Sequence, residues 1–122
     1  MYNVAITGTG VFTPTEVISN DELVASFNAY ADLYNIENAS RIAAGELEAK
    51  PQSSADFILA ASGIEQRYVL DKSGVLDPTR MFPKLPQRAD DSPGYMAEIG
   101  VSACKKALAA AGLEASQIDL MI

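Results

Sequence analysis

The pattern of apolar and polar positions along the chain predicts four helices and three short strands. The first helix is expected after Ser19, which together with Glu22 three residues later forms the pattern of a capping box. A second helix, charged and weakly packed, is expected over residues 36–49 and is ended by Pro51. Four residues at spacings of three and four place an apolar face on the first helix: Leu23, Phe27, Tyr30 and Tyr34.

Serine and glycine bound the elements that follow. Ser53 and Ser54 are candidate caps of a short helix that continues through Ala61. Gly63 is expected to close this helix in the left-handed conformation, where glycine carries no steric cost. An apolar and β-branched stretch over residues 67–70 then predicts a strand.

Residues 71–91 are expected to form a long loop, because three prolines fall within nine residues of it. A loop of this length is uncommon in a compact domain unless it is functional or covers a partner. Ser92 and Pro93 next fit the cap and the first residue of a helix that Gly112 ends. This helix carries a stripe of mostly small apolar residues: Met96, Ile99, Ala103, Ala107 and Ala110.

Apolar stretches near both ends predict further strands, at residues 4–7 and 118–122. The second is almost entirely apolar, which is typical of a central strand covered on both faces. Three strands and their helices cannot cover one another's faces in a chain of 122 residues. We therefore expect the N-terminal part of a larger α/β unit, poorly soluble by itself.

The stretch Gly8-Thr9-Gly10 after the first predicted strand has the beginning of a dinucleotide-binding loop. The third glycine position of that motif holds Thr13, and Pro14 prevents the helix that the loop must open. A strand end with a tight backbone turn is therefore the favoured interpretation.

Composition narrows the possible functions. Sixteen acidic residues against nine basic ones give a net charge of -7, which argues against nucleic acid and anionic membrane surfaces as partners. No apolar run approaches the roughly 20 residues of a membrane span. The chain has no histidine and one cysteine, so it lacks a Ser-His or Cys-His pair and a multi-cysteine metal site. A cytoplasmic protein is the expectation, with Cys104 a buried structural thiol and not a nucleophile.

Three stretches together resemble the N-terminal segment of β-ketoacyl-acyl-carrier-protein synthase III, in the thiolase-like superfamily: VAITGTGVFTPTEVISNDEL, SADFILAASGIEQRYV and MAEIGVSACKKALAAAGLEASQIDLMI. They carry the family's Gly-x-Gly-x-x-x-Pro from Gly8 to Pro14, its Asn-Asp-x-Leu at residues 20–23, and its Ser-Gly-Ile-x-x-Arg from Ser62 to Arg67. The resemblance implies an α/β fold, the N-terminal part of a layered αβαβα arrangement, with insertions at about residues 30–52 and 71–91.

The resemblance implies a condensing enzyme that joins an acyl thioester to malonyl-acyl carrier protein with loss of CO2. Its catalytic Cys, His and Asn would lie beyond Ile122, and no cofactor or metal is expected. The implied partners are acyl-CoA or acyl carrier protein, with a second copy in a homodimer. The alternatives are a thiolase-like acyltransferase, a head-to-head condensing relative, or a non-catalytic fragment that only binds a partner chain.

The resemblance also implies substrate contacts at the mouth of the pantetheine tunnel: Phe57, Ala61 and Ser62. Family members place a Trp and an Arg one turn apart on this helix, beside the adenine of coenzyme A. Here Phe57 can still stack, although packing on the strand below is an equal alternative, and Ala61 brings no charge. Arg67 is expected to be a structural ion-pair partner. Both insertions are expected to cover the substrate entrance, with the dimer interface as a second possible site.

Overall fold

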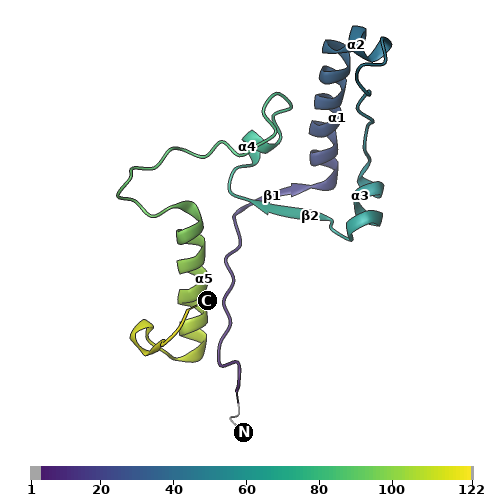
Figure 1. Cartoon of the computed structure of the whole chain (residues 1–122). Coiled ribbons are helices and arrows are strands. Elements are labelled where there is room, and N and C mark those ends of the chain that lie inside the picture. Colours follow the sequence, from purple (N-terminus) through teal and green to yellow (C-terminus); the bar gives the residue numbers. More distant parts are fainter. Residues whose placement is uncertain (1–3, 122) are drawn as a thin grey trace. The chain divides into compact units, whose positions relative to one another are not determined.

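The computed structural model describes residues 4–121 and divides into two compact units (Figure 1). Residues 14–86 form one unit, called here the sheet unit; residues 4–13 and 87–121 form the other, called the helix unit. The content is mixed helix and strand, which agrees with the expected α/β class. The layered thiolase-like arrangement stays a prediction.

The sheet unit is built on a two-stranded antiparallel sheet whose first strand leads directly into the longest helix (Figure 1). The strands pair from Glu16 opposite Val69 to Ser19 opposite Gln66. Ile18 on the first strand is 1% exposed and Ala31 on the long helix is fully buried, so the core lies where these elements meet. The elements are β1 (Glu16–Ser19), α1 (Asn20–Glu37), α2 (Ala39–Ala43), α3 (Ala55–Ser62), β2 (Gln66–Val69) and α4 (Lys72–Val75).

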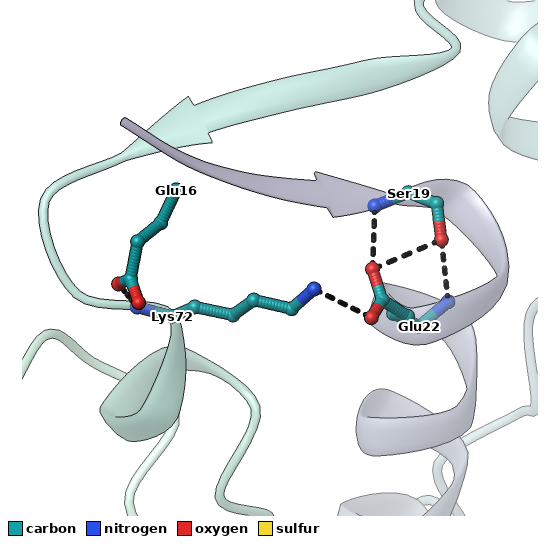
Figure 2. Close-up of polar contacts among 4 residues, drawn as sticks. All are labelled: Glu16, Ser19, Glu22 and Lys72. Carbon is teal, nitrogen blue, oxygen red and sulfur yellow. Dashed lines mark hydrogen bonds and ion pairs between the residues drawn. The ribbon is translucent and has the colours of Figure 1, made fainter. Parts of the chain in front are cut away.

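The predicted capping box at the start of α1 is confirmed, and Lys72 extends it (Figure 2). The amide of Glu22 donates to Ser19 Oγ at 3.2 Å, and the amide of Ser19 donates to Glu22 Oε2 at 3.0 Å. Lys72 Nζ lies 2.6 Å from Glu22 Oε1, while the Lys72 amide donates to Glu16 Oε2 at 2.6 Å. The start of α4 is thereby tied to both β1 and α1.

The residues between α2 and α3 return along α1 in an extended conformation (Figure 1), held by two asparagine side chains. Asn35 accepts from the amide of Lys50 at 2.8 Å and donates to its carbonyl at 3.0 Å. Asn28 makes the same pair of bonds to Ser53, at 2.8 and 3.1 Å. Each amide therefore pairs with the returning backbone as a neighbouring strand would.

The predicted helix over residues 36–49 is wrong in its extent. Helix α1 runs on to Glu37, α2 is a separate short helix, and the chain leaves it at Gly45. Gly45 has a φ of +75°, a conformation that ends a helix well before Pro51. Strand β2 agrees with the strand predicted at 67–70 within one residue, whereas β1 was not predicted.

The helix unit contains α5 (Tyr95–Ala111), the 3-10 turn η1 (Ala115–Gln117) and an extended segment, residues 4–13, beside α5 (Figure 1). Gly112 follows α5 in the left-handed conformation, as predicted. The predicted start at Ser92-Pro93 is wrong, because Gly94 caps the helix. Arg88 donates to the Pro93 carbonyl at 2.7 Å and to Glu98 at 2.6 Å, which keeps Pro93 in the loop before α5.

Gly8 and Gly10 serve close packing against α5, which corrects the expectation of a tight turn. A Cβ atom at Gly8 would meet the carbonyl of Ala107 and the amide of Ala111. A Cβ atom at Gly10 would meet the carbonyl of Ala103 and lie 2.5 Å from the amide of Ala107. The two glycines thus lie against the backbone of α5 at Ala103 and Ala107, two of the predicted stripe positions. Two other members of the stripe, Met96 and Ala110, are exposed.

The strands predicted at residues 4–7 and 118–122 do not form among the described residues. Residues 4–7 and 118–121 are without strand pairing, and Ile122 lies outside the described part of the chain. Val4, Leu120 and Met121 are 94%, 74% and 82% exposed. An extended apolar segment becomes a strand only when a neighbouring strand accepts its backbone hydrogen bonds.

The Glu22–Lys72 contact makes stability depend on pH. Hydrogen bonds from Lys72 and from the backbone of Ser19 lower the pKa of Glu22 from 4.5 to about 2. A lowered pKa in the folded state stabilises the fold above pH 4.5, and this contribution is lost as the pH falls from 4.5 toward 2. We expect Glu22→Gln to be less stable than wild type at pH 7 and to approach it below pH 3, measured by urea unfolding. A stability difference that stays constant over this range would contradict the linkage.

The glycine contacts predict opposite effects for two alanine substitutions in the helix unit. Gly10→Ala should destabilise the protein by about 1–3 kcal/mol, because the new methyl group overlaps the backbone of α5. Gly100→Ala should stabilise it by about 0.5–1 kcal/mol, since Gly100 is inside α5 with nothing within 4 Å of the new atom. Thermal unfolding of both variants measures the difference, and equal effects would argue against the close packing.

Candidate functional site

The candidate site is the exposed side of α3, the short helix that carries the predicted substrate contacts. Ser54 caps it, accepting a hydrogen bond from the Phe57 amide at 3.1 Å. Gly63 ends it with a φ of +68°, which confirms the predicted left-handed closure. None of its residues is fully buried, and only Ala55 and Ile58 are half-buried. The helix therefore rests on α1 along a narrow contact.

Phe57 and Ala61 lie one helical turn apart and are both exposed, so they share a face of α3. Phe57 is 67% exposed, so it does not pack on a strand among the described residues. Ser62 is not part of that face: its hydroxyl donates to the Ile58 carbonyl at 2.7 Å and accepts from the Ile64 amide at 3.2 Å. Ser62 therefore serves the end of the helix.

The charge of this helix differs from what an anionic ligand requires. Its single charged residue is Asp56 in the first turn, and Ala61 presents a methyl group where a cation could sit. An exposed aromatic ring with a small neighbour can stack on a planar group or contact an apolar chain. It cannot neutralise a phosphate.

Asn20 joins the second and third family motifs. Its side chain donates to the Ile64 carbonyl at 2.7 Å, and its backbone amide donates to the Glu65 carbonyl at 3.2 Å. Arg67 donates to Asn20 Oδ1 at 2.8 Å. Arg67 is thus structural, as expected, but its partner is a buried amide and not a carboxylate. The motif spacing is explained by this contact between the start of α1 and the exit of α3.

Three shallow grooves surround α1, and Phe27 lines all of them. One, of about 500 Å³, lies between Phe27 and Phe57. A smaller groove of about 230 Å³ includes Ile58 and Met81. The third, of about 470 Å³, lies between α1 and residues 78–81 and is lined by Tyr30 and Tyr34 among others. Phe27 therefore borders grooves that include residues of α3 and of both segments that were predicted as insertions.

The second of these segments is ordered by two aspartates. Asp71 caps α4, accepting from the amides of Ser73 at 3.1 Å and Gly74 at 3.0 Å, and it also accepts from the amide of Lys84. Asp77 accepts from the Thr79 amide at 2.9 Å. Hydrogen bonds from the Ser73 and Thr79 hydroxyls respectively are the main cause of the lowered pKa of each carboxyl. The predicted loop is thus a defined structure containing a helical turn.

This segment is also attached to α1 through Ser26. The buried Ser26 hydroxyl donates to the Leu76 carbonyl at 2.9 Å and lies 3.5 Å from the sulfur of Met81. Met81 has a φ of +58°, which is unfavourable for a residue with a side chain. Its amide donates to the Asp77 carbonyl at 2.9 Å, so the turn holds this conformation in place.

Cys104 is exposed, which corrects the prediction of a buried thiol. It lines a groove of about 440 Å³ on α5 together with Leu108, Ile118 and Leu120. The prediction assumed a sheet under this face of the helix, and no strand covers it among residues 4–121. Within the same residues no group of three acidic or thiol side chains could hold a metal ion, and no helix is long and apolar enough to cross a membrane.

Sequence analysis missed the asparagines that organise the sheet unit. Asn20, Asn28 and Asn35 stand seven or eight residues apart on α1, a spacing that places polar side chains on one side of a helix every two turns. That regularity was visible in the sequence. Its structural role can be recognised, however, only from the backbone at Lys50 and Ser53 that lies beside the helix.

Comparisons with known proteins identify a relative. No known family profile matches the chain. The chain is 47% identical over 97 residues, 80% of its length, to a beta-ketodecanoyl-acyl-carrier-protein synthase of Pseudomonas aeruginosa. It spans 28% of the length of that relative. The resemblance indicated by the motifs is therefore confirmed: over four fifths of its length, this chain is similar to a segment of a β-ketoacyl-acyl-carrier-protein synthase.

Proposed function

We propose that the chain is the segment of a condensing enzyme that forms the entrance for the acyl donor. The complete enzyme joins an acyl thioester to malonyl-acyl carrier protein with release of CO2, and its catalytic Cys, His and Asn lie beyond Ile122. The observation that carries this proposal is the 47% identity to a β-ketoacyl synthase over 97 residues. That identity extends over 80% of the chain.

The exposed face of α3 is the proposed donor contact. The pantetheine arm is common to acyl-CoA and acyl carrier protein, so either donor can pass an aromatic ring at this position. Phe57 supplies the ring, being 67% exposed at the edge of an apolar groove. Ala61 and Asp56 leave the helix without a cation, which favours a donor whose recognition does not depend on phosphate contacts here.

The two inserted segments form the far border of this entrance. They meet along α1, where Tyr30 and Tyr34 face Pro78 and Met81 across the groove of about 470 Å³. Phe27 lines this groove and also the groove beside α3. A homodimer, with these segments near the boundary between its subunits, is part of the same proposal.

Replacing Phe57 tests the donor contact. In the complete enzyme, Phe57→Ala should raise KM for the acyl donor about tenfold and leave kcat nearly unchanged, because stacking on one aromatic ring contributes about 1–3 kcal/mol. Leu59→Ala is the matched control, since Leu59 is 43% exposed on the other side of the same helix. Steady-state kinetics with a series of acyl-CoAs and the matching acyl carrier protein thioesters measures both variants. An unchanged donor KM for Phe57→Ala would remove α3 from the entrance.

Adding the missing cation tests donor choice. Ala61→Arg places a guanidinium one turn from Phe57 on the exposed face of α3. We expect KM for acyl-CoA to fall about three- to tenfold, since an arginine can bind a phosphate through charge-assisted hydrogen bonds. Ala61→Gln, a polar side chain without charge, should lack this effect. An equal decrease for both variants would show that polarity and not charge is responsible.

A further inference from the structure

We propose that Asn28 is a positioning residue for the acyl donor: its amide fixes the start of α3 and so sets where the Phe57 ring lies. The proposal rests on the proposed function, because it concerns the same entrance. It adds a residue that makes no contact with the substrate and that no sequence motif contains.

The first observation is that α3 is held from α1 at both of its ends. At its start, Asn28 accepts from the Ser53 amide at 2.8 Å and donates to the Ser53 carbonyl at 3.1 Å, one residue before the capping Ser54. At its end, Asn20 donates to the Ile64 carbonyl at 2.7 Å, one residue after Gly63. Both attachments are side-chain amides bound to backbone atoms, so they fix the path of the chain and not only its side chains.

The second observation is the order of the two attachments. Asn20 and Asn28 are eight residues apart on α1, which corresponds to about 12 Å at 1.5 Å per residue. The backbone that they bind, at Ile64 and Ser53, lies just outside the two ends of α3. The chain through α3 therefore runs from the Asn28 attachment back toward the Asn20 attachment, opposite to the direction of α1.

The third observation is that little else holds α3 in place. None of its side chains is fully buried, and Ile58 is the α3 residue in the small apolar groove with Phe27. An isolated helix of eight residues is unstable in water, so its orientation depends on what binds its ends. Phe57 is in the first turn, three residues after Ser54, and is therefore closer to the Asn28 attachment than to the Asn20 attachment.

Asn35 provides a matched control on the same helix. It is half-buried like Asn28 and makes the same two bonds, at 2.8 and 3.0 Å, to the backbone of Lys50. That attachment is three residues further from α3 along the chain. Replacing either asparagine by alanine removes two hydrogen bonds of the same kind from the same segment. A difference in donor binding between the two variants therefore reports on where the segment is attached, and not on the number of hydrogen bonds lost.

The test is steady-state kinetics of Asn28→Ala and Asn35→Ala in the complete enzyme, with straight-chain acyl-CoAs and the matching acyl carrier protein thioesters as donors. Asn28→Ala should raise donor KM about five- to tenfold at nearly constant kcat, while KM for malonyl-acyl carrier protein stays unchanged. Asn35→Ala should leave donor KM within about twofold of wild type. Asn28→Asp, which keeps the acceptor for the Ser53 amide, should recover part of the donor affinity.

Equal donor KM for Asn28→Ala and Asn35→Ala would overturn the proposal, as would a fall in kcat alone. Thermal unfolding of both variants in the same buffer distinguishes a change in donor positioning from a general loss of fold. A general loss of fold would lower the melting temperature and the kcat of Asn28→Ala together. Phe57→Ala is measured in parallel. If it raises donor KM and Asn28→Ala does not, the entrance is correct and the positioning role is wrong; if neither does, the entrance itself is wrong.

Discussion

The sheet unit depends on one buried amide, that of Asn20. Asn20 is 7% exposed, and both ends of its amide group are hydrogen-bonded, to Ile64 and Arg67. It stands where β1 becomes α1 and binds the chain where α3 becomes β2, so it ties two junctions that are more than 40 residues apart in sequence. The pairing of Ser19 with Gln66 lies beside it and sets the register of the whole sheet. Loss of this amide would leave a carbonyl and a guanidinium without a partner, which costs more than the net value of the bonds themselves.

The helix unit depends on a different constraint, the absence of a side chain at Gly8 and Gly10. Gly8 and Gly10 allow the extended segment to lie against the backbone of α5, and the alanines of the facing stripe allow the same approach from the other side. Lys106 then donates to the Val11 carbonyl at 2.9 Å, which satisfies one polar atom of the segment. Arg88 fixes the loop before α5 by stacking on Tyr95 and by bonding to Glu98. The interaction with Arg88 lowers the pKa of the Glu98 carboxyl.

Local signals in the sequence were sufficient at several helix ends. The capping box at Ser19, the cap at Ser54 and the closing residues Gly63 and Gly112 were all predicted, because each satisfies backbone groups within four residues. They failed at two other helix ends, because the chain leaves α2 at Gly45 and Gly94 caps α5 in place of Ser92. The remaining predictions failed where the outcome depends on distant partners. Strand β1 has the short sequence EVIS and exists because β2 pairs with it, and Cys104 is exposed because no strand among the described residues covers its helix face. Phe57 is exposed on α3, where its binding role stays a proposal, and the proposed role of Asn28 could be recognised only once Ser53 lay beside it.

The way residues 39–53 are attached has a consequence for local unfolding. Helix α2 contains no buried residue, and the segment after it is held to α1 by the amides of Asn28 and Asn35 and by a bond from Gln52 to Asp32. Bonds of this kind can break without exposing an apolar core. We therefore expect residues 39–53 to open locally at a lower free-energy cost than the sheet. Their amide protons are expected to exchange with solvent through that local opening and not through global unfolding. Because opening at the Ser53 end also releases the start of α3, the least protected part of the sheet unit is connected directly to the helix that presents Phe57.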